Sequence, residues 1–263
     1  MKKLLSTALL ATAGAALLPC GVGAQNVTFN PGDLILGFRE TGRANDLVID
    51  LGQASLFSSP AHASFNLTGL SIADINAVFG SINNVSWGVA GVWRLGSPTP
   101  PPINTLFTTT TRPSLSTPSS PLTQASSQSQ QNVGAKIESI GDNFSGSPAT
   151  ANSSTATIQN ASLSYSYNSY LGSGGNFGGT YLAANGSIET TTPANFSSGG
   201  VQYEDLYELQ PGSGPGTLIG TFALGSGGTM TFTAAPEPSA LTLMGGAAAG
   251  LLFLRFRRRA SKP

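Results

Sequence analysis

The chain has 263 residues, 40% of them hydrophobic, which is enough for one large folded domain or two small ones. Only 9% of the residues are charged, against roughly 25% in an average soluble protein, while 33 are glycine and 17 are proline, so short strands and turns are favoured over long salt-bridged helices. Residues 25–235 hold five basic and eleven acidic residues, which argues against nucleic acid or another polyanion held there by broad electrostatics.

The first 24 residues have the three parts of a secretory signal peptide in their usual order. Two lysines follow Met1, a largely apolar stretch runs from Leu4 to Leu18, and Val22-Gly23-Ala24 offers the small residues of a cleavage site. A buried N-terminal helix is the alternative, but this order favours a signal helix that leads the chain to the Sec machinery. We expect signal peptidase to cut after Ala24. The only cysteine, Cys20, would be lost with this segment, so the mature protein would have no disulfide, thiolate metal site or cysteine nucleophile.

The clearest local patterns come early in the exported region. Hydrophobic residues alternate with other residues at 34–38 and at 47–51, which predicts two strands joined in a hairpin. Ser71 is a good N-cap for a helix that runs to Phe79 and stops at Gly80.

The middle of the chain is harder to interpret. Residues 85–93 alternate strictly and predict a strand. Residues 97–131 are rich in Ser, Thr, Pro and Gln, which is typical of a flexible linker or of a loop within one domain, and we favour the loop. Against a plain loop, Leu106 and Phe107 within this segment hint at a strand. The spacing of apolar residues in 133–140, just after it, hints at a second helix.

The last part of the exported region predicts a β-meander. Strand candidates at 206–210, 217–224 and 229–233 are separated by stretches rich in glycine and proline. Together these elements predict that residues 25–235 form a mainly β domain, similar to a sandwich or a jelly roll, with one or two short helices.

Three features follow one another at the C-terminal end, beginning with the extended peptide Pro236-Glu237-Pro238. Residues 240–254 are apolar or small apart from one threonine, and a helix there would span about 22 Å, which is short of a hydrocarbon core of about 30 Å. A cluster of stop-transfer arginines comes next: Arg255, Arg257, Arg258 and Arg259. By the positive-inside rule these arginines stay in the cytoplasm, so that the chain before Pro236 lies outside.

This order of features resembles the PEP-CTERM sorting domain, over residues 236–263. The resemblance implies recognition by an exosortase, a membrane-embedded enzyme similar to cysteine proteases, after transient residence of the chain in the inner membrane. It also implies cleavage near Pro236-Glu237-Pro238 and release to the cell surface or extracellular matrix. Proteins of this type accompany exopolysaccharide production in biofilms. An ordinary transmembrane tail is the alternative for residues 240–254.

The exported region offers few residues for chemistry. His62 is the only histidine, and no G-x-S-x-G elbow accompanies a serine, so a Ser-His-Asp triad has no support in the pattern. Acidic residues gather at two places: Asp46 with Asp50, and Glu204 with Asp205 and Glu208. Paired carboxylates can serve a glycosidase or bind Ca²⁺, but a solvated strand face is the expected arrangement because no D-x-D-x-D-G loop is present. We predict no catalytic residue, no metal site and no cofactor.

Two other groups are candidates for contacts with glycans. Trp87 and Trp93 fall on one face of the strand at 85–93 and would make a platform for sugar rings, although core packing is the default for large aromatic residues. Thr229, Thr231 and Thr233 share a strand face and would suit ice or glycans, although a short threonine ladder is ordinary on an exposed strand.

Two functions for the exported domain therefore stay open. The first is a non-catalytic protein of the surface or of the extracellular matrix, associated with exopolysaccharide. The second is a carbohydrate-binding or carbohydrate-degrading module. The first needs no site and is favoured because the sequence offers none.

Overall fold

The computed structural model describes residues 25–58, 64–94, 101–171, 185 and 187–235. Ten strands lie in this part of the chain: β1 (Asp33–Arg39), β2 (Asn45–Gln53), β3 (Ser64–Asn66), β4 (Ser86–Trp93), β5 (Thr105–Arg112), β6 (Ala156–Asn160), β7 (Thr190–Thr191), β8 (Val201–Leu209), β9 (Thr217–Gly225) and β10 (Met230–Ala234). The helices are α1 (Ser55–Ser58), α2 (Ile72–Phe79), α3 (Ser127–Phe144), α4 (Tyr167–Leu171) and the 3₁₀ turn η1 (Phe196–Ser198). The prediction of a mainly β domain is confirmed.

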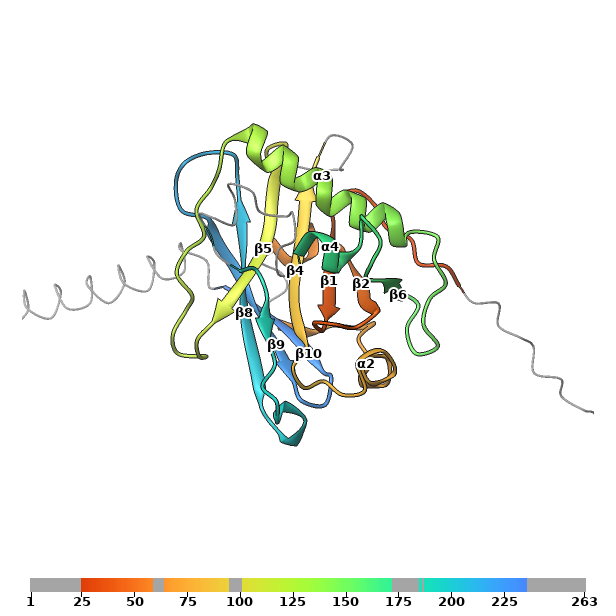
Figure 1. Cartoon of the computed structure of the whole chain (residues 1–263). Coiled ribbons are helices and arrows are strands. Elements are labelled where there is room, and N and C mark those ends of the chain that lie inside the picture. The colour runs from red at the N-terminus through yellow and green to blue at the C-terminus, as the bar shows by residue number, and fades with distance from the viewer. Residues whose placement is uncertain (1–24, 59–63, 95–100, 172–184, 186, 236–263) are drawn as a thin grey trace, which may run out of the picture.

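The strands form one antiparallel sheet in the order β3-β10-β9-β8-β5-β4-β1-β2-β6, and the short β7 pairs with β4. The sheet curls, so that β8, β9 and β10 turn away from the plane of β1, β2 and β4 (Figure 1). Because the sheet curls, side chains on its inner face pack against one another, whereas those on its outer face can be buried only by helices or loops. The finer expectation of a sandwich or jelly roll stays a prediction.

The inner face is filled by a hydrophobic cluster that joins the two halves of the curled sheet. Phe57 of α1 contacts Phe222 of β9 and Phe232 of β10, with ring centroids 5.7 and 5.1 Å apart. Helix α2 adds Ile75 and Phe79 to the same cluster. Packing of this kind is worth about 25 cal/mol per Å² of apolar surface removed from water, so it is the main force that keeps the sheet curled.

Helices α3 and α4 cover the outer face of the central strands (Figure 1). Helix α3 lies across β4 and β5 and buries Val133, Ile137 and Ile140, whose spacing gives one apolar stripe. Helix α4 sets the Tyr167 ring directly above Gly37 of β1, where a side chain on residue 37 would overlap the ring. The outer face is therefore buried over β1, β2 and β4.

Helix α2 forms as the sequence predicts. The Ser71 hydroxyl accepts a hydrogen bond from the Ala73 N–H at 3.2 Å, which satisfies one of the free amides at the helix start. Gly80 ends the helix with a φ of 82° and donates its N–H to the Asn76 carbonyl at 2.8 Å.

Residues 97–131 differ from the expectation of a loop or linker. Their described part contains β5, which pairs with β4 on one side and with β8 on the other and so lies in the middle of the sheet. It also contains the start of α3, which is longer than the helix predicted at 133–140. A central strand of the sheet therefore lies inside this segment, and the hint of a strand at Leu106 and Phe107 is confirmed.

The sheet divides beside β4. Residues 90–93 of β4 pair with β5, whereas Ser86 and Trp87 pair with β7, so that the segment around β7 enters between β4 and β5. At the branch point the Thr109 hydroxyl accepts from the Val89 N–H at 2.9 Å and donates to the Ile188 carbonyl at 3.0 Å. Within the described ranges, no helix is both long and apolar enough to cross a membrane.

Candidate functional site

The outer face of β5, β8, β9 and β10 carries two rows of side chains that cross the strands. The first row consists of Arg112, Tyr203, Ala223 and Thr231. The second consists of Thr110, Asp205, Thr221 and Thr233. Residues that alternate with these rows, such as Phe222, point into the inner cluster. Because neighbouring strands are about 4.8 Å apart, each row brings its side chains into contact distance.

Arg112 is held in place by four hydrogen bonds at one edge of these rows. Its Nη1 donates to Asp205 Oδ1 at 2.8 Å and to Thr221 Oγ1 at 3.2 Å. Its Nε donates to the Ser114 carbonyl at 2.9 Å, and its Nη2 donates to the Leu115 carbonyl at 2.6 Å. The guanidinium thus fastens the segment after β5 to the sheet.

Asp205 is the partner that neutralises this arginine. Burial alone would raise the pKa of Asp205, but hydrogen bonds from Ser119, Arg112 and Thr221 outweigh burial and hold the pKa below its usual value. Both the N–H and the hydroxyl of Ser119 donate to Oδ2 at 2.8 Å. The pair is therefore ionised at neutral pH, and its two charges cancel locally.

A cavity of about 280 Å³ lies over the two rows, and we call it the outer groove. Its floor is formed by Tyr203, Thr221, Ala223 and Thr233, and its wall by Leu115 and Pro118 from the segment after β5. Among the described residues, none forms a hydrogen bond with the hydroxyl of Tyr203 or of Thr233. The groove therefore offers an aromatic ring, free hydroxyls and small apolar side chains, with no uncompensated charge.

A second cavity, of about 320 Å³, lies between β2, α1 and β3. Phe57, Phe65 and Leu67 make it largely apolar, and Asp50 is its only ionisable lining residue in the described part of the chain. The pKa of Asp50 is raised to about 7, mainly by burial. The Gly52 N–H opposes this rise through a 2.7 Å hydrogen bond, and the nearby Asp33 adds to it. Asp33, the carboxyl that acts on Asp50, is buried and does not line the cavity.

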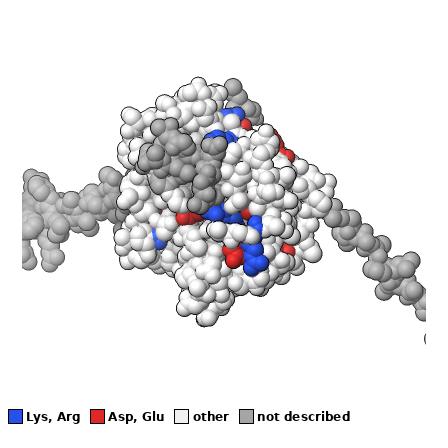
Figure 2. All heavy atoms as spheres, viewed as in Figure 1, with Lys and Arg blue, Asp and Glu red and all other residues white. Residues whose placement is uncertain are grey.

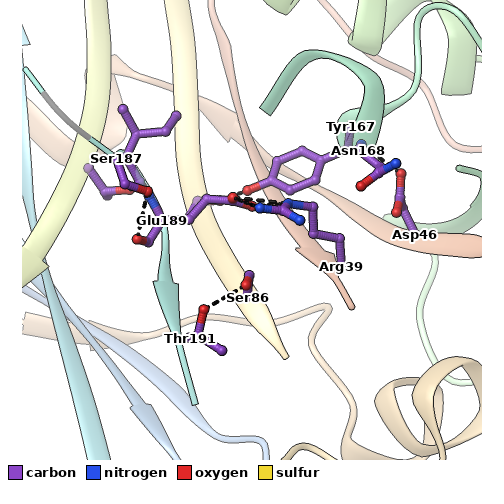
Figure 3. A network of polar contacts seen from close by, with 11 residues as sticks. Arg39, Asp46, Ser86, Tyr167, Asn168, Ser187, Glu189 and Thr191 are labelled. Atoms are coloured by element: carbon purple, nitrogen blue, oxygen red, sulfur yellow. Dashed lines mark hydrogen bonds and ion pairs between the residues drawn. The ribbon is translucent and has the colours of Figure 1, made fainter. Parts of the chain in front are cut away.

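A buried ion pair lies on the outer face beneath α4, where Arg39 and Glu189 point toward one another (Figure 3). Arg39 Nε donates to both carboxylate oxygens at 3.0 Å, and Nη2 donates to Oε2 at 2.6 Å. The two side chains are only 10% and 4% exposed. Burial raises the pKa of Glu189 above its usual value, although Arg39 and Tyr167 lower it in part.

Asp46 belongs to the same buried group. Its carboxylate accepts a hydrogen bond from the Asn168 N–H at 2.8 Å, at the start of α4 (Figure 3). The pKa of Asp46 is raised to about 7, mainly by burial. The Asn168 N–H and Arg39 oppose this rise, and Glu189 adds to it. At neutral pH this carboxyl is therefore close to half protonated.

Glu204 of β8 lies fully buried near this group. Neither of its carboxyl oxygens makes a hydrogen bond of normal geometry to a described residue. Burial first, and then Glu189 and Asp205, raise the pKa of Glu204 well above its usual value, and the Thr109 hydroxyl and the Thr190 N–H only partly offset them. An isolated carboxylate in such a place would cost several kcal/mol, so burial favours the protonated form of Glu204.

The structure changes the interpretation of the sequence candidates. Trp87 and Trp93 are 0% and 4% exposed and pack in the inner cluster, so neither offers a ring face to a glycan at the surface. The solvated strand face expected for the acidic residues is wrong for Asp46, Glu204 and Asp205, which are at most 1% exposed. Asp46 lies under α4 and Asp205 under the segment after β5, whereas Glu204 lies in the same cross-strand row as Phe222 of the inner cluster.

Of the threonine ladder, Thr231 and Thr233 lie on the outer face of β10, whereas Thr229 precedes the strand. Sequence reasoning missed Tyr203 and Arg112 as groove residues and Tyr167 with the Arg39–Glu189 pair as a buried group. The sequence did hold a signal for Arg112: it directly follows four threonines, which favour a strand, so Arg112 could be expected on a strand face. No local pattern joins Arg39 to Glu189, which are 150 residues apart.

Other candidates lie outside the described residues: Ala24, His62, Pro236, Glu237, Pro238 and the four arginines after residue 254. In the part of the chain that is described, no three His, Cys, Asp or Glu side chains are grouped so as to hold a metal ion. The face in Figure 2 is uncharged over most of its area, and its basic and acidic side chains lie next to one another. No family model matches the chain, and neither a curated protein nor a solved structure was found to be similar to it.

Proposed function

We propose that this chain is an exported protein of the cell surface or extracellular matrix, which an exosortase releases from a C-terminal sorting signal. In this proposal residues 1–24 are the signal helix, removed after Ala24. Residues 240–254 form a short hydrophobic helix that holds the chain in the inner membrane, with the arginine cluster in the cytoplasm, until cleavage near Glu237. The released domain would then associate with exopolysaccharide.

The observation that carries the proposal is that both ends of the described range 25–235 are hydrogen-bonded to the domain. Val27 donates its N–H to the Ser147 carbonyl at 2.9 Å, and Gln25 accepts from the Ala149 N–H at 2.8 Å, so the chain is tied to the domain from its first described residue. At the other end, Ala235 donates to the Ile219 carbonyl at 2.9 Å. Cuts after Ala24 and beyond Ala235 would remove none of these contacts and neither hydrophobic cluster.

A non-catalytic role fits the placement of the ionisable groups. Asp46, Glu189 and Glu204 have raised pKa values, which are typical of active sites, but they are at most 8% exposed and lie beneath packed segments. Substrate would have no access to them without local unfolding. We therefore infer that they specify the fold and take no part in a reaction.

The test is to express the full chain in a host that has an exosortase and to compare wild type with Glu237→Ala. Mass spectrometry of the extracellular protein should find the mature form without residues 240–263, while Glu237→Ala should accumulate as a precursor in the inner membrane. Glu40→Ala, which loses only an exposed pair with Arg43, is the control and should be released like wild type. Peptides that contain Leu251–Arg255 in the mature extracellular protein would overturn the proposal.

A further inference from the structure

We propose that the outer groove binds a neutral saccharide, with one sugar ring lying against Tyr203. This proposal is separate from the sorting proposal, because it concerns the ligand that the exported domain binds outside the cell. Ala235 lies at the rim of the groove, so cleavage after this residue would leave the binding surface complete.

The shape of the groove suits a ring with an apolar face. Tyr203 is half-buried, and the strand pairing sets Arg112 on one side of it and the small Ala223 on the other. Ala223 keeps the floor low, while Leu115 and Pro118 form an apolar wall. A sugar ring has C–H groups on its faces and hydroxyls around its edge, and an aromatic side chain with a polar tip matches both.

The polar groups of the groove match the edge of such a ring. Tyr203 and Thr233 have hydroxyls that make no hydrogen bond to another described residue, and a hydroxyl both donates and accepts. Arg112 Nη2 uses one N–H on the Leu115 carbonyl, and its second N–H has no partner among the described residues. Sugar hydroxyls would satisfy all three groups, which a purely apolar ligand would leave unpaired.

Charge decides which saccharides fit. Arg112 is the only basic residue of the described groove lining, and Asp205 already compensates it at 2.8 Å. With eleven acidic and five basic residues between 25 and 235, the domain repels uronic-acid and sulfated polymers. The volume of about 280 Å³ is just below the range of roughly 300–1,000 Å³ for drug-sized ligands, so the groove holds a single ring of a longer chain.

The experiment uses the full chain, produced with its own signals and purified in detergent from whichever fraction contains it. The purified protein is applied to an array of neutral hexasaccharides (α-glucan, β-glucan, mannan and galactan) and of hexasaccharides of galacturonic acid. Calorimetry then measures the strongest neutral binder with wild type and Tyr203→Ala. Tyr165→Ala is the matched control, because Tyr165 is a tyrosine 53% exposed on the segment between β6 and α4.

We expect binding of a neutral hexasaccharide that weakens at least tenfold in Tyr203→Ala and less than twofold in Tyr165→Ala. If Tyr203→Ala fails to fold by circular dichroism, Tyr203→Phe and Thr233→Val, which remove one hydroxyl each, should weaken binding two- to fivefold. Failure of every neutral glycan to bind, equal binding of galacturonate, or unchanged affinity in these variants would overturn the proposal. A fault in sorting changes only the fraction from which the protein is recovered, so the two proposals fail separately.

Discussion

Replacing Arg39 by methionine tests the importance of the buried ion pair. The substitution keeps most of the apolar volume but leaves Glu189, whose side chain is 4% exposed, without the cation that donates three hydrogen-bond contacts to its carboxylate. Removing one partner of a buried pair typically costs about 3–5 kcal/mol of stability. In Arg39→Met the unpaired carboxyl can take up a proton, so the cost depends on pH.

The direction of this dependence follows from the pKa of Glu189. Burial already raises that pKa in the wild type, and loss of Arg39 removes two influences that lower it. A group whose pKa is higher in the folded than in the unfolded state stabilises the protein below the unfolded pKa and loses that contribution as the pH rises. We therefore expect Arg39→Met to lose about 3–4 kcal/mol at pH 8 but only about 1–2 kcal/mol at pH 5.

Urea unfolding, followed by the fluorescence of the buried Trp87 and Trp93, measures both values. Arg43→Met is the control, because Arg43 forms an exposed pair with Glu40 and should cost less than about 1 kcal/mol at either pH. A loss of stability in Arg39→Met that is below 1 kcal/mol at pH 8, or equal at the two pH values, would refute the reasoning.

Three further predictions concern the same buried region. Gly37→Ala should lower stability by more than about 2 kcal/mol, because the new methyl group overlaps the buried Tyr167 ring, whereas Gly227→Ala, which has open space, should change it by under about 0.5 kcal/mol in the same urea assay. Because the pKa of Asp46 is raised to about 7, the contribution of this carboxyl to the stability of the fold is lost as the pH rises from about 4 through 7. Asp46→Asn should therefore be more stable than wild type at pH 8, by on the order of 2 kcal/mol, and its free energy of unfolding should depend less on pH. Glu204→Gln should not destabilise the protein at pH 7, since burial raises the pKa of Glu204 well above its usual value and favours the protonated form; a loss above about 2 kcal/mol in chemical denaturation would refute this reasoning.

The elements that the sequence predicted well are those whose signals are local. Helix α2 has its N-cap at Ser71 and its stop at Gly80, and the three strands of the C-terminal meander are bounded by turns rich in glycine. Strand β5 was foreseen only as a hint at Leu106 and Phe107, because its run of threonines lies in a segment of biased composition. Thr105, Thr108 and Thr109 are nevertheless fully buried, since the β-branched threonine suits a strand and its hydroxyl can satisfy backbone groups where two strands part.

The buried acids could not be recognised from the sequence for a different reason. Asp46 occupies a position that alternates with hydrophobic residues such as Leu47 and Ile49, and in an antiparallel sheet with one wet face such a position is solvated. Whether the second face is wet depends on what packs on it. That cover comes from α4, more than a hundred residues beyond Asp46, and no local pattern announces it.

The ion pair also explains how a short strand finds its place in the sheet. The segment around β7 has only two residues in strand conformation, so its backbone pairing with β4 is too short to fix its register. Polar side chains supply the missing specificity: the Thr109 hydroxyl donates to the Ile188 carbonyl, Thr192 donates to the Ile82 carbonyl at 2.5 Å, and Arg39 binds Glu189. A shift by one residue would turn Glu189 away from Arg39 and leave both charges buried and unpaired. We therefore expect the pair to select this register over one shifted by a residue, which is the best-attested role of buried ion pairs.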